Sequence, residues 1–264
     1  MAHSVRTIVL RAAGSNCDVE TAFAFESVGS KVELVHINRL VRGEVRLADY
    51  DILAIPGGFT YGDDISAGKI LANELRYKLA DQVEQFHQDG KLILGICNGF
   101  QVLVKSGLLP SGHIRDGKQQ ITLTANDSGK FEDRWVYLEV NPESPCVFTR
   151  GIEGRITLPV AHAEGKFVPA SDGVLKELQS KGQIVFRYVG PEGQFPAYPW
   201  NPNGSVDNVA ALCDPTGRIL GMMPHPERHL DPTHHPRWTR EGLHAEGQGV
   251  AIFRNAVEYV RRHL

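Results

Sequence analysis

The sequence predicts an α/β fold, with a mostly parallel β-sheet covered by helices and an added antiparallel part. Three observations lead to it: short apolar runs alternate with helical segments through the first hundred residues, strand-like runs separated by turns follow, and one amphipathic segment ends the chain. The 264 residues are 42% hydrophobic and 22% charged, an ordinary composition for a globular protein. We therefore expect one domain over residues 1–264.

The opening hundred residues alternate between strand and helix patterns. Four short apolar runs predict buried strands, at residues 6–10, 31–37, 51–55 and 91–96. Helical spacing is found between them, at residues 17–29 and 66–90. In the second of these segments, apolar residues recur at near-helical intervals, at Ile70, Leu71, Leu75, Leu79, Val83 and Phe86. Gly90 then supplies a C-terminal stop. This βαβ alternation is typical of a parallel sheet with helices on its faces.

Beyond a helix expected at residues 100–107, the pattern changes to antiparallel structure. Six strand-like runs follow, at residues 121–125, 134–140, 155–161, 183–189, 209–213 and 218–223. The turn residues 214–217 (DPTG) between the last two predict a hairpin. Residues 249–264 form an amphipathic stripe that predicts a closing helix packed on the sheet. The polar residues 229–248 show no periodicity, and we expect an ordered surface excursion there.

Composition and charge exclude several functions. Lysine and arginine number 28 against 31 acidic residues, so the net charge is −3, and no basic stripe is available to bind nucleic acid. The sequence contains no run of 18 apolar residues that would predict a membrane span, and its first residues do not resemble a signal peptide. We therefore expect a cytoplasmic protein. The cysteines are widely spaced, form no CxxC pair and are expected to be free thiols: Cys17, Cys97, Cys146 and Cys213.

Cys97 lies in the frame Gly95-Ile96-Cys97-Asn98-Gly99, which has the G-x-nucleophile-x-G form of a strand-to-helix elbow. A Cβ at either glycine would crowd such a turn. The turn places the thiol at a helix N-terminus, whose positive end stabilises a thiolate, and directs the Asn98 amide to the same place. The pattern indicates a reactive thiol. The alternative is a buried cysteine that packs as a small hydrophobe.

A thiol that accepts an acyl group also needs a base and oxyanion donors. His225 and Glu227 follow the last predicted strand, and in an extended segment residues two apart point the same way, so Glu227 can orient the His225 ring. Gly57 and Gly58 follow the third predicted strand, where an exposed amide can approach a ligand closely. The alternatives are a solvent-exposed His-Pro-Glu loop and an ordinary Pro-Gly-Gly turn.

Two phosphate-binding patterns and one metal-binding pattern are incomplete. Residues 112–118 (GHIRDGK) lack the Ser or Thr that a P-loop needs after its lysine, and residues 62–69 (GDDISAGK) have five residues between the glycines instead of four. Prolines interrupt a group of histidines that no partner motif completes: His225, His229, His234 and His235. We expect neither a nucleoside triphosphate site nor a metal in this chain.

Taken together, GICNGFQ (95–101) and MPHPER (223–228) resemble the class I glutamine amidotransferases. Four further stretches resemble, within that class, the glutaminase subunits of phosphoribosylformylglycinamidine synthases: GSNCD (14–18), PGGFTYGDDISAGKI (56–70), NDSGKFEDRWVYLEV (126–140) and ITLPVAHAEGKFV (156–168). The resemblance therefore covers nearly the whole chain. Two features depart from the family pattern, because AAGSNCD has no proline before its glycine and the 229–248 excursion is longer than in the shortest members.

The resemblance implies a flavodoxin-like, doubly wound, mostly parallel sheet with helices on both faces and an added antiparallel part. It assigns Cys97 as the nucleophile, His225 as the acid and base, and Glu227 as the group that orients His225. It also implies an oxyanion hole and a set of glutamine contacts. The oxyanion hole comprises the amides of Gly58 and Asn98, and the contacts are Gly57, Gln101, Ala161, His162 and Ala163. At His162 the backbone is an alternative to the ring.

By the same resemblance, the chain hydrolyses L-glutamine to glutamate and ammonia through a cysteine thioester. Because the sequence contains no recognisable ATP site, ATP and Mg are expected on a partner synthetase subunit. That subunit uses the ammonia to convert formylglycinamide ribonucleotide to formylglycinamidine ribonucleotide in purine biosynthesis, and a small third subunit bridges the two.

Several alternatives remain at this point. They are another class I amidotransferase, a γ-glutamyl hydrolase, and a flavodoxin-like redox or binding protein with a reactive elbow cysteine. The paired His225 and Glu227 favour an acyl-transfer enzyme, because a redox thiol needs no base oriented to protonate a leaving group. Cys17, Cys146 and Cys213 are interpreted as structural thiols, although Cys17 follows a strand in the same loop layer as the active site.

Overall fold

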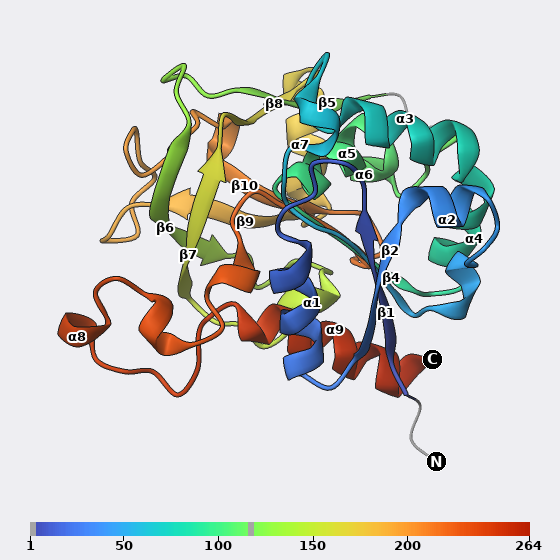
Figure 1. Cartoon of the computed structure of the whole chain (residues 1–264). Helices are drawn as coiled ribbons and strands as arrows, with labels where there is room; N and C mark the ends of the chain where they lie inside the picture. Colours follow the sequence, from blue (N-terminus) through green and yellow to red (C-terminus); the bar gives the residue numbers. More distant parts are fainter. Residues whose placement is uncertain (1–3, 116–118) are drawn as a thin grey trace.

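The computed structural model of the chain describes residues 4–115 and 119–264. Residues 1–3 and the end of the 112–118 stretch lie outside the described residues. Within the described ranges the strands form one nine-stranded sheet, in the order β2-β1-β3-β4-β11-β10-β9-β6-β7, and a separate two-stranded sheet, β5-β8. Figure 1 shows the helices arranged around the large sheet. The fold is therefore α/β, as the sequence predicts.

The parallel half of the large sheet contains the four strands of the opening hundred residues and one late strand. Its strands are β1 (Arg6–Arg11), β2 (Lys31–His36), β3 (Ile52–Ile55), β4 (Leu92–Ile96) and β11 (Ile219–Met222). Every residue of β3, β4 and β11 is buried, as expected for strands covered on both faces. The order β2-β1-β3-β4-β11 is the flavodoxin-like order of a doubly wound sheet, which confirms the predicted fold class.

The antiparallel half begins at β10, which pairs with β11 on the side opposite β4. Its strands are β10 (Val209–Cys213), β9 (Ile184–Val189), β6 (Glu132–Val140) and β7 (Arg155–His162), and the small sheet pairs β5 (Ile121–Ala125) with β8 (Glu164–Pro169). The predicted hairpin at residues 214–217 joins β10 to β11. The Asp214 carboxylate closes it by accepting hydrogen bonds from the amides of Thr216, Arg218 and Ile219.

The helices in the described ranges are α1 (Asp18–Ser27), α2 (Ile37–Val41), α3 (Lys69–Lys78), α4 (Ala80–Gln88), α5 (Asn98–Ser106), α6 (Leu108–Ser111), α7 (Asp172–Ser180), α8 (Trp238–Glu241) and α9 (Val250–His263). Those that pack on the parallel half cover both of its faces, whereas α7 packs against β8 and α8 lies within residues 229–248. Helix α9 lies beside α1, where the Phe25 and Phe253 rings meet edge to face at 5.0 Å. Helix α5 packs against β3, β4 and α3. Because right-handed crossovers run outward in opposite directions from β1 and β3, α1 and α3 lie on opposite faces.

Some elements differ from the sequence prediction. The single helix predicted over residues 66–90 is divided at Leu79, whose φ of −126° is not helical. Hydrogen bonds from Leu79 to Leu75 and from Val83 to Leu79 continue across the division, so the apolar spacing gives no sign of it. The helix also begins later than predicted, because Gly68 before it has a φ of +73°. Strand β8 and helices α2 and α7 were not predicted, since they are short and carry few buried apolar residues.

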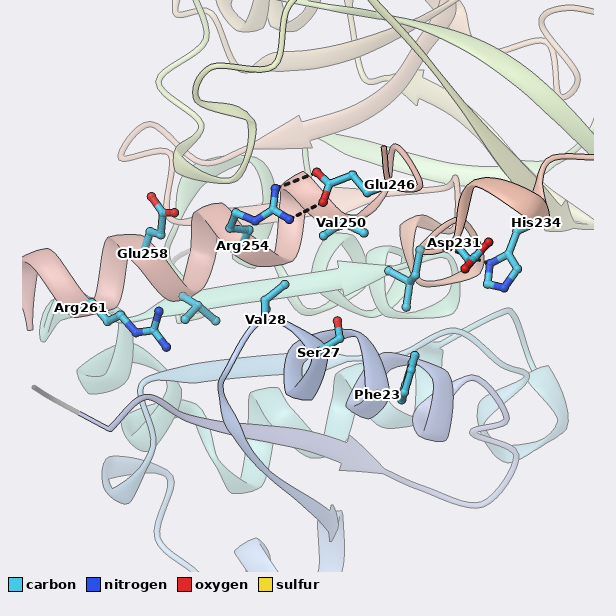
Figure 2. A pocket seen from close by; sticks show the side chains of 12 residues that line it. Phe23, Ser27, Val28, Asp231, His234, Glu246, Val250, Arg254, Glu258 and Arg261 are labelled. Atoms are coloured by element: carbon cyan, nitrogen blue, oxygen red, sulfur yellow. Dashed lines mark hydrogen bonds and ion pairs between the residues drawn. The ribbon is translucent and has the colours of Figure 1, made fainter. Parts of the chain in front are cut away.

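Residues 229–248 pack against the antiparallel half. The Trp135 ring meets the rings of His229 and His235 edge to face, and Arg237 donates a hydrogen bond of 2.8 Å to the Tyr137 hydroxyl. Between this segment, α1 and α9 lies a groove of about 660 Å³ (Figure 2). None of the sequence-predicted site residues lines it. In the described ranges no helix has the length and apolar character needed to cross a membrane.

A substitution at Gly99 can test whether α5 must lie this close to the sheet. A Cβ at Gly99 would lie 1.9 Å from the Ile55 carbonyl oxygen, whereas a Cβ at Gly173 would meet only Ser171 Oγ at 3.5 Å. We expect Gly99→Ala to destabilise the fold by about 3 kcal/mol or more, and the control Gly173→Ala, in α7, to be neutral or slightly stabilising. Urea unfolding followed by circular dichroism measures both, and equal midpoints for the two variants would contradict the prediction.

Candidate active site

The carboxyl ends of four neighbouring strands bring the predicted site residues together. Cys97 follows β4, Gly57 and Gly58 follow β3, and His225 follows β11. Cys17 follows β1 and joins them, because the loop after β1 pairs with the loop after β3 at Ser15 and Gly58. In an open α/β sheet this edge is where ligands bind.

Cys97 lies on a strained elbow between β4 and α5. Its φ of 51° and ψ of −104° are unusual for a residue with a side chain. The flanking glycines allow the turn, because a Cβ at Gly95 would lie 2.5 Å from Leu103 and one at Gly99 would overlap Ile55. The turn holds the thiol at the N-terminus of α5, where it contacts the Ala161 carbonyl at 3.6 Å. Such an elbow presents a nucleophile, as the sequence pattern predicts.

Two backbone amides in the loops after β3 and β4 have no hydrogen-bond partner among the described residues. The Cys97 amide bonds to the Met222 carbonyl at 2.7 Å, but the next amide, of Asn98, starts α5 and has no partner within residues 4–115 and 119–264. The amide of Gly58 also has none in these ranges, since the pairing of its loop uses the amides of Asn16 and Phe59. Gly58 has a φ of +151°, and a Cβ there would lie 2.6 Å from the Gly14 carbonyl. Both predicted oxyanion donors are therefore free to bind a ligand atom.

His225 and Glu227 form a buried pair. Nδ1 of His225 lies 2.6 Å from a Glu227 carboxylate oxygen, and the His225 amide bonds to the Pro159 carbonyl of β7 at 2.8 Å. In place of the extended segment predicted here, a 3-10 turn over Pro226–Arg228 brings the two side chains together. Nε2 of His225 has no hydrogen-bond partner among the described residues. The ring is therefore oriented by the carboxylate and keeps its other nitrogen for a reacting group.

The surroundings of His225 favour the protonated ring. Burial alone lowers the pKa of the imidazole, but the Glu227 carboxylate and then the Cys97 and Cys17 sulfurs raise this pKa well above its ordinary value of 6.5. The nearby His162 is in the opposite state, because burial and repulsion from His225 lower its pKa to about 3. The site thus contains one charged and one neutral histidine at neutral pH.

Gln101 and Asn98 belong to a hydrogen-bond network behind the nucleophile. The Asn98 side chain accepts a bond of 2.7 Å from the Thr60 hydroxyl and donates to Asp63 and to Gln101 at 3.1 and 2.9 Å. Gln101 in turn donates to the Glu164 carbonyl. Both ends of the Gln101 amide are thus engaged within the protein. Asn98 ties the loop after β3 to α5, and Gln101 ties the start of β8 to it.

Residues 161–163 are held in place by Asn126. The Asn126 side-chain nitrogen donates to the His162 carbonyl at 2.8 Å, its oxygen lies 3.1 Å from His162 Nδ1, and its amide donates to the Ala163 carbonyl at 2.9 Å. The Asn126 oxygen also accepts from the Gly165 amide, so His162 Nδ1 must carry the proton in this contact. The His162 ring is therefore a buried, neutral group, and the Ala161 carbonyl is the atom that reaches the thiol.

Several residues at the site were not predicted from the sequence. Thr60, Asp63, Asn126 and Glu164 support the predicted residues, and Arg228 donates a hydrogen bond of 3.1 Å to Cys17. All lie in stretches that carry the family resemblance, which is the only signal that could have identified them. Their roles depend on contacts between distant parts of the chain.

One cluster in the described part of the chain has the composition of a metal site. Ligand atoms of Cys17, His225 and Glu227 lie within 4.8 Å of one another. His225 Nδ1, however, is hydrogen-bonded to Glu227, so the ring and the carboxylate face each other and do not converge on a common point. The geometry fits a proton-transfer pair better than a set of metal ligands.

Comparisons with known proteins identify relatives over the full length. Residues 4–260 match the model of the CobB/CobQ-like glutamine amidotransferase domain. The chain is 52% identical over 259 residues to "phosphoribosylformylglycinamidine synthase subunit PurQ" of Dehalococcoides mccartyi, with 98% of each chain covered. It is 42% identical over 270 residues to the protein of the same name from Methanococcus maripaludis, with 97% of this chain and 98% of the other covered.

Two solved structures are also similar. The structure of PurLQS from Thermotoga maritima matches with a TM-score of 0.74 and 31% identity, over 98% of this chain and 100% of the matched chain. A glutamine amidotransferase from the same organism matches with a TM-score of 0.56 over 98% of this chain and 99% of the other. At 16% identity, that second likeness supports the fold alone.

The protonation states of the two histidines can be measured directly. We expect His225 to be protonated at pH 7, because its pKa is raised, and to lose its proton only as the pH rises well above 6.5. His162 is expected to stay neutral at all pH values well above about 3. Glu227→Gln should lower the pKa of His225, because burial then acts without the compensating carboxylate. NMR titration of ¹⁵N-labelled histidine, assigned with His225→Gln, tests this, and a wild-type His225 pKa at or below 6.5 would contradict it.

Proposed function

We propose, because the chain belongs to the CobB/CobQ-like glutamine amidotransferase family, that it is the glutaminase subunit of a phosphoribosylformylglycinamidine synthase. The observation that carries the proposal is the grouping of Cys97 on its elbow, the unpartnered amides of Gly58 and Asn98, and the His225–Glu227 pair. An acyl-transfer enzyme needs a nucleophile, an oxyanion site and an oriented acid. Membership of the CobB/CobQ-like glutamine amidotransferase family supports glutamine as the acyl donor.

The first half of the reaction forms a thioester. The Cys97 thiolate attacks the side-chain amide carbon of glutamine, and the amides of Gly58 and Asn98 hold the resulting oxyanion. The His225 imidazolium gives its proton to the departing nitrogen, so that ammonia leaves. Because the pKa of His162 is lowered to about 3, that ring is neutral and has no proton on Nε2 to compete in this step.

The second half releases glutamate. Water attacks the thioester carbon while neutral His225 takes a proton from it and becomes the imidazolium again. The Cys97 thiolate then leaves. The Glu227 carboxylate keeps the ring in the tautomer that places the reacting nitrogen, Nε2, toward the substrate. We place Gly57, the Ala161 carbonyl and the backbone of residues 162–163 beside the bound glutamine. Gln101 holds the neighbouring start of β8 in position.

The ammonia is used on a partner. We propose that a synthetase subunit binds ATP and Mg²⁺ and aminates formylglycinamide ribonucleotide, and that a small third subunit bridges it to this chain. The structure of PurLQS from Thermotoga maritima, whose matched chain is 31% identical to this one, supports this proposal. A cytoplasmic location, expected from the sequence, stays a prediction.

Cys97→Ala separates the two half-reactions. In the complex reconstituted with its synthetase, this variant should lower glutamine-dependent product formation to below about a thousandth of the wild-type rate, because no thioester can form. Activity with added ammonium chloride should remain, since it bypasses the glutaminase. Product formation measured with each nitrogen source checks this, and wild-type rates with glutamine for Cys97→Ala would rule out the mechanism.

We further predict that the isolated chain is a poor glutaminase. An ammonia donor that works without a loaded acceptor wastes glutamine, and no acceptor site was recognised in this sequence. Steady-state glutamate release should therefore rise when the synthetase and its substrates are added. The measurement compares release with and without the partner, with Cys97→Ala as the blank, and equal rates would refute the prediction.

A further inference from the structure

We propose that Cys17 and Arg228 form a positioning pair for His225: the Arg228 guanidinium holds the Cys17 sulfur beside the imidazole, and this contact keeps Nε2 turned toward Cys97. The inference rests on the proposed function for its kinetic consequence, but its structural content is independent of the reaction. From the sequence alone, Cys17 is interpreted as a structural thiol and no role is predicted for Arg228.

The Cys17 sulfur is fixed by two hydrogen bonds. It donates to the Asn16 side-chain oxygen at 3.4 Å and accepts from Arg228 Nη2 at 3.1 Å. The Cys17 amide is also bonded, to the Gly57 carbonyl at 3.1 Å. The side chain is only 2% exposed, so this is a defined contact in the interior and not a surface thiol. Donating and accepting at once, Cys17 acts as an oriented polar group.

The same sulfur lies against His225. A Cβ at Gly57 would be 2.8 Å from His225 Cε1 and 3.2 Å from the Cys17 sulfur, so ring and sulfur both touch the open side of this glycine. The sulfur also lies within 4.8 Å of a ring nitrogen of His225. The bond to Glu227 fixes Nδ1 but leaves the ring free to tilt about that bond. The Cys17 side of the ring supplies a second constraint.

Charge supports the arrangement. The groups that face His225 are Glu227 from its own loop, Cys97 from the elbow, Cys17 from the loop after β1, and His162 from β7. Both sulfurs favour the protonated ring, together with Glu227. Burial lowers the pKa of Arg228, but the charges of Cys17 and Glu227 raise it more, so the guanidinium stays charged. Arg228 is thus a charged donor that bonds directly to the Cys17 sulfur.

The pair makes a specific kinetic prediction. Cys17→Ala should reduce kcat for glutamine about tenfold with KM changed less than about twofold, because the ring is mispositioned while the substrate pocket is intact. Cys17→Ser, which keeps a small polar group, should lose less. Arg228→Gln should match Cys17→Ala, and Arg228→Lys should recover part of the loss. The double variant Cys17→Ala/Arg228→Gln should be no worse than either single variant, as expected for residues that act through one contact.

A pH profile and an NMR titration separate positioning from general damage. Cys17→Ala removes a group that raises the pKa of His225, so this pKa and the alkaline limb of kcat/KM should both move to lower pH. Cys146→Ala is the control and should leave both unchanged, because this buried thiol belongs to a residue beside Gly217, in the hairpin before β11, whereas His225 follows the other end of that strand. Thermal unfolding identifies variants that do not fold; in that case Cys17→Ser and the Arg228 variants carry the test.

The proposal is overturned if Cys17→Ala keeps both the wild-type kcat and the wild-type pKa of His225, or if the losses of the two single variants multiply in the double variant. Failure of the proposed function looks different. A wild-type complex that releases no glutamate from glutamine would reject the glutaminase assignment, while the NMR pKa of His225 in the same variants would still decide whether Cys17 and Arg228 position the ring.

Discussion

The strained backbone at Cys97 is the constraint on which the rest of the site depends. A non-glycine residue with a φ of 51° costs on the order of 1–3 kcal/mol and persists only where its surroundings enforce it. Here the Cys97 amide bonds to β11, and Gly99 lets α5 begin in contact with the Ile55 carbonyl of β3. The elbow is therefore fixed by both neighbouring strands of the sheet, and those strands also carry the groups that the thiol needs.

The order of the strands explains why these groups meet. Strand β4 lies between β3 and β11, so residues far apart in the chain follow adjacent strands at one edge of the sheet. The loop after β3 brings Gly58, and the loop after β11 brings His225 with its orienting carboxylate. The antiparallel half adds the Ala161 carbonyl from β7 and a backbone contact to His225 through Pro159. The late strands therefore complete a site that the opening hundred residues could only begin.

Patterns local in sequence predicted most of the fold and the three side chains of the candidate catalytic group. The buried strands follow from continuous apolar runs, and the elbow follows from two glycines that flank a cysteine. What could not be predicted depends on contacts across the fold. The break at Leu79 preserves the apolar spacing, Asn126 acts through three contacts to residues 161–163, and Cys17 meets Arg228 only because β1 and β11 end at the same edge. Glu227 reaches His225 through a turn that replaced the assumed extended segment.

The two buried histidines show how the site controls a single proton. His225 contacts a carboxylate, which stabilises a positive ring even in an interior that disfavours charge. His162 contacts the amide oxygen of Asn126, which accepts a hydrogen bond but has no full charge to offset burial. The charge on His225 also repels a second positive charge on His162, so the two rings are not both protonated. Nε2 has no hydrogen-bond partner in either ring among the described residues, so the partner at Nδ1 makes the difference: Glu227 favours a protonated His225, and Asn126 leaves His162 neutral.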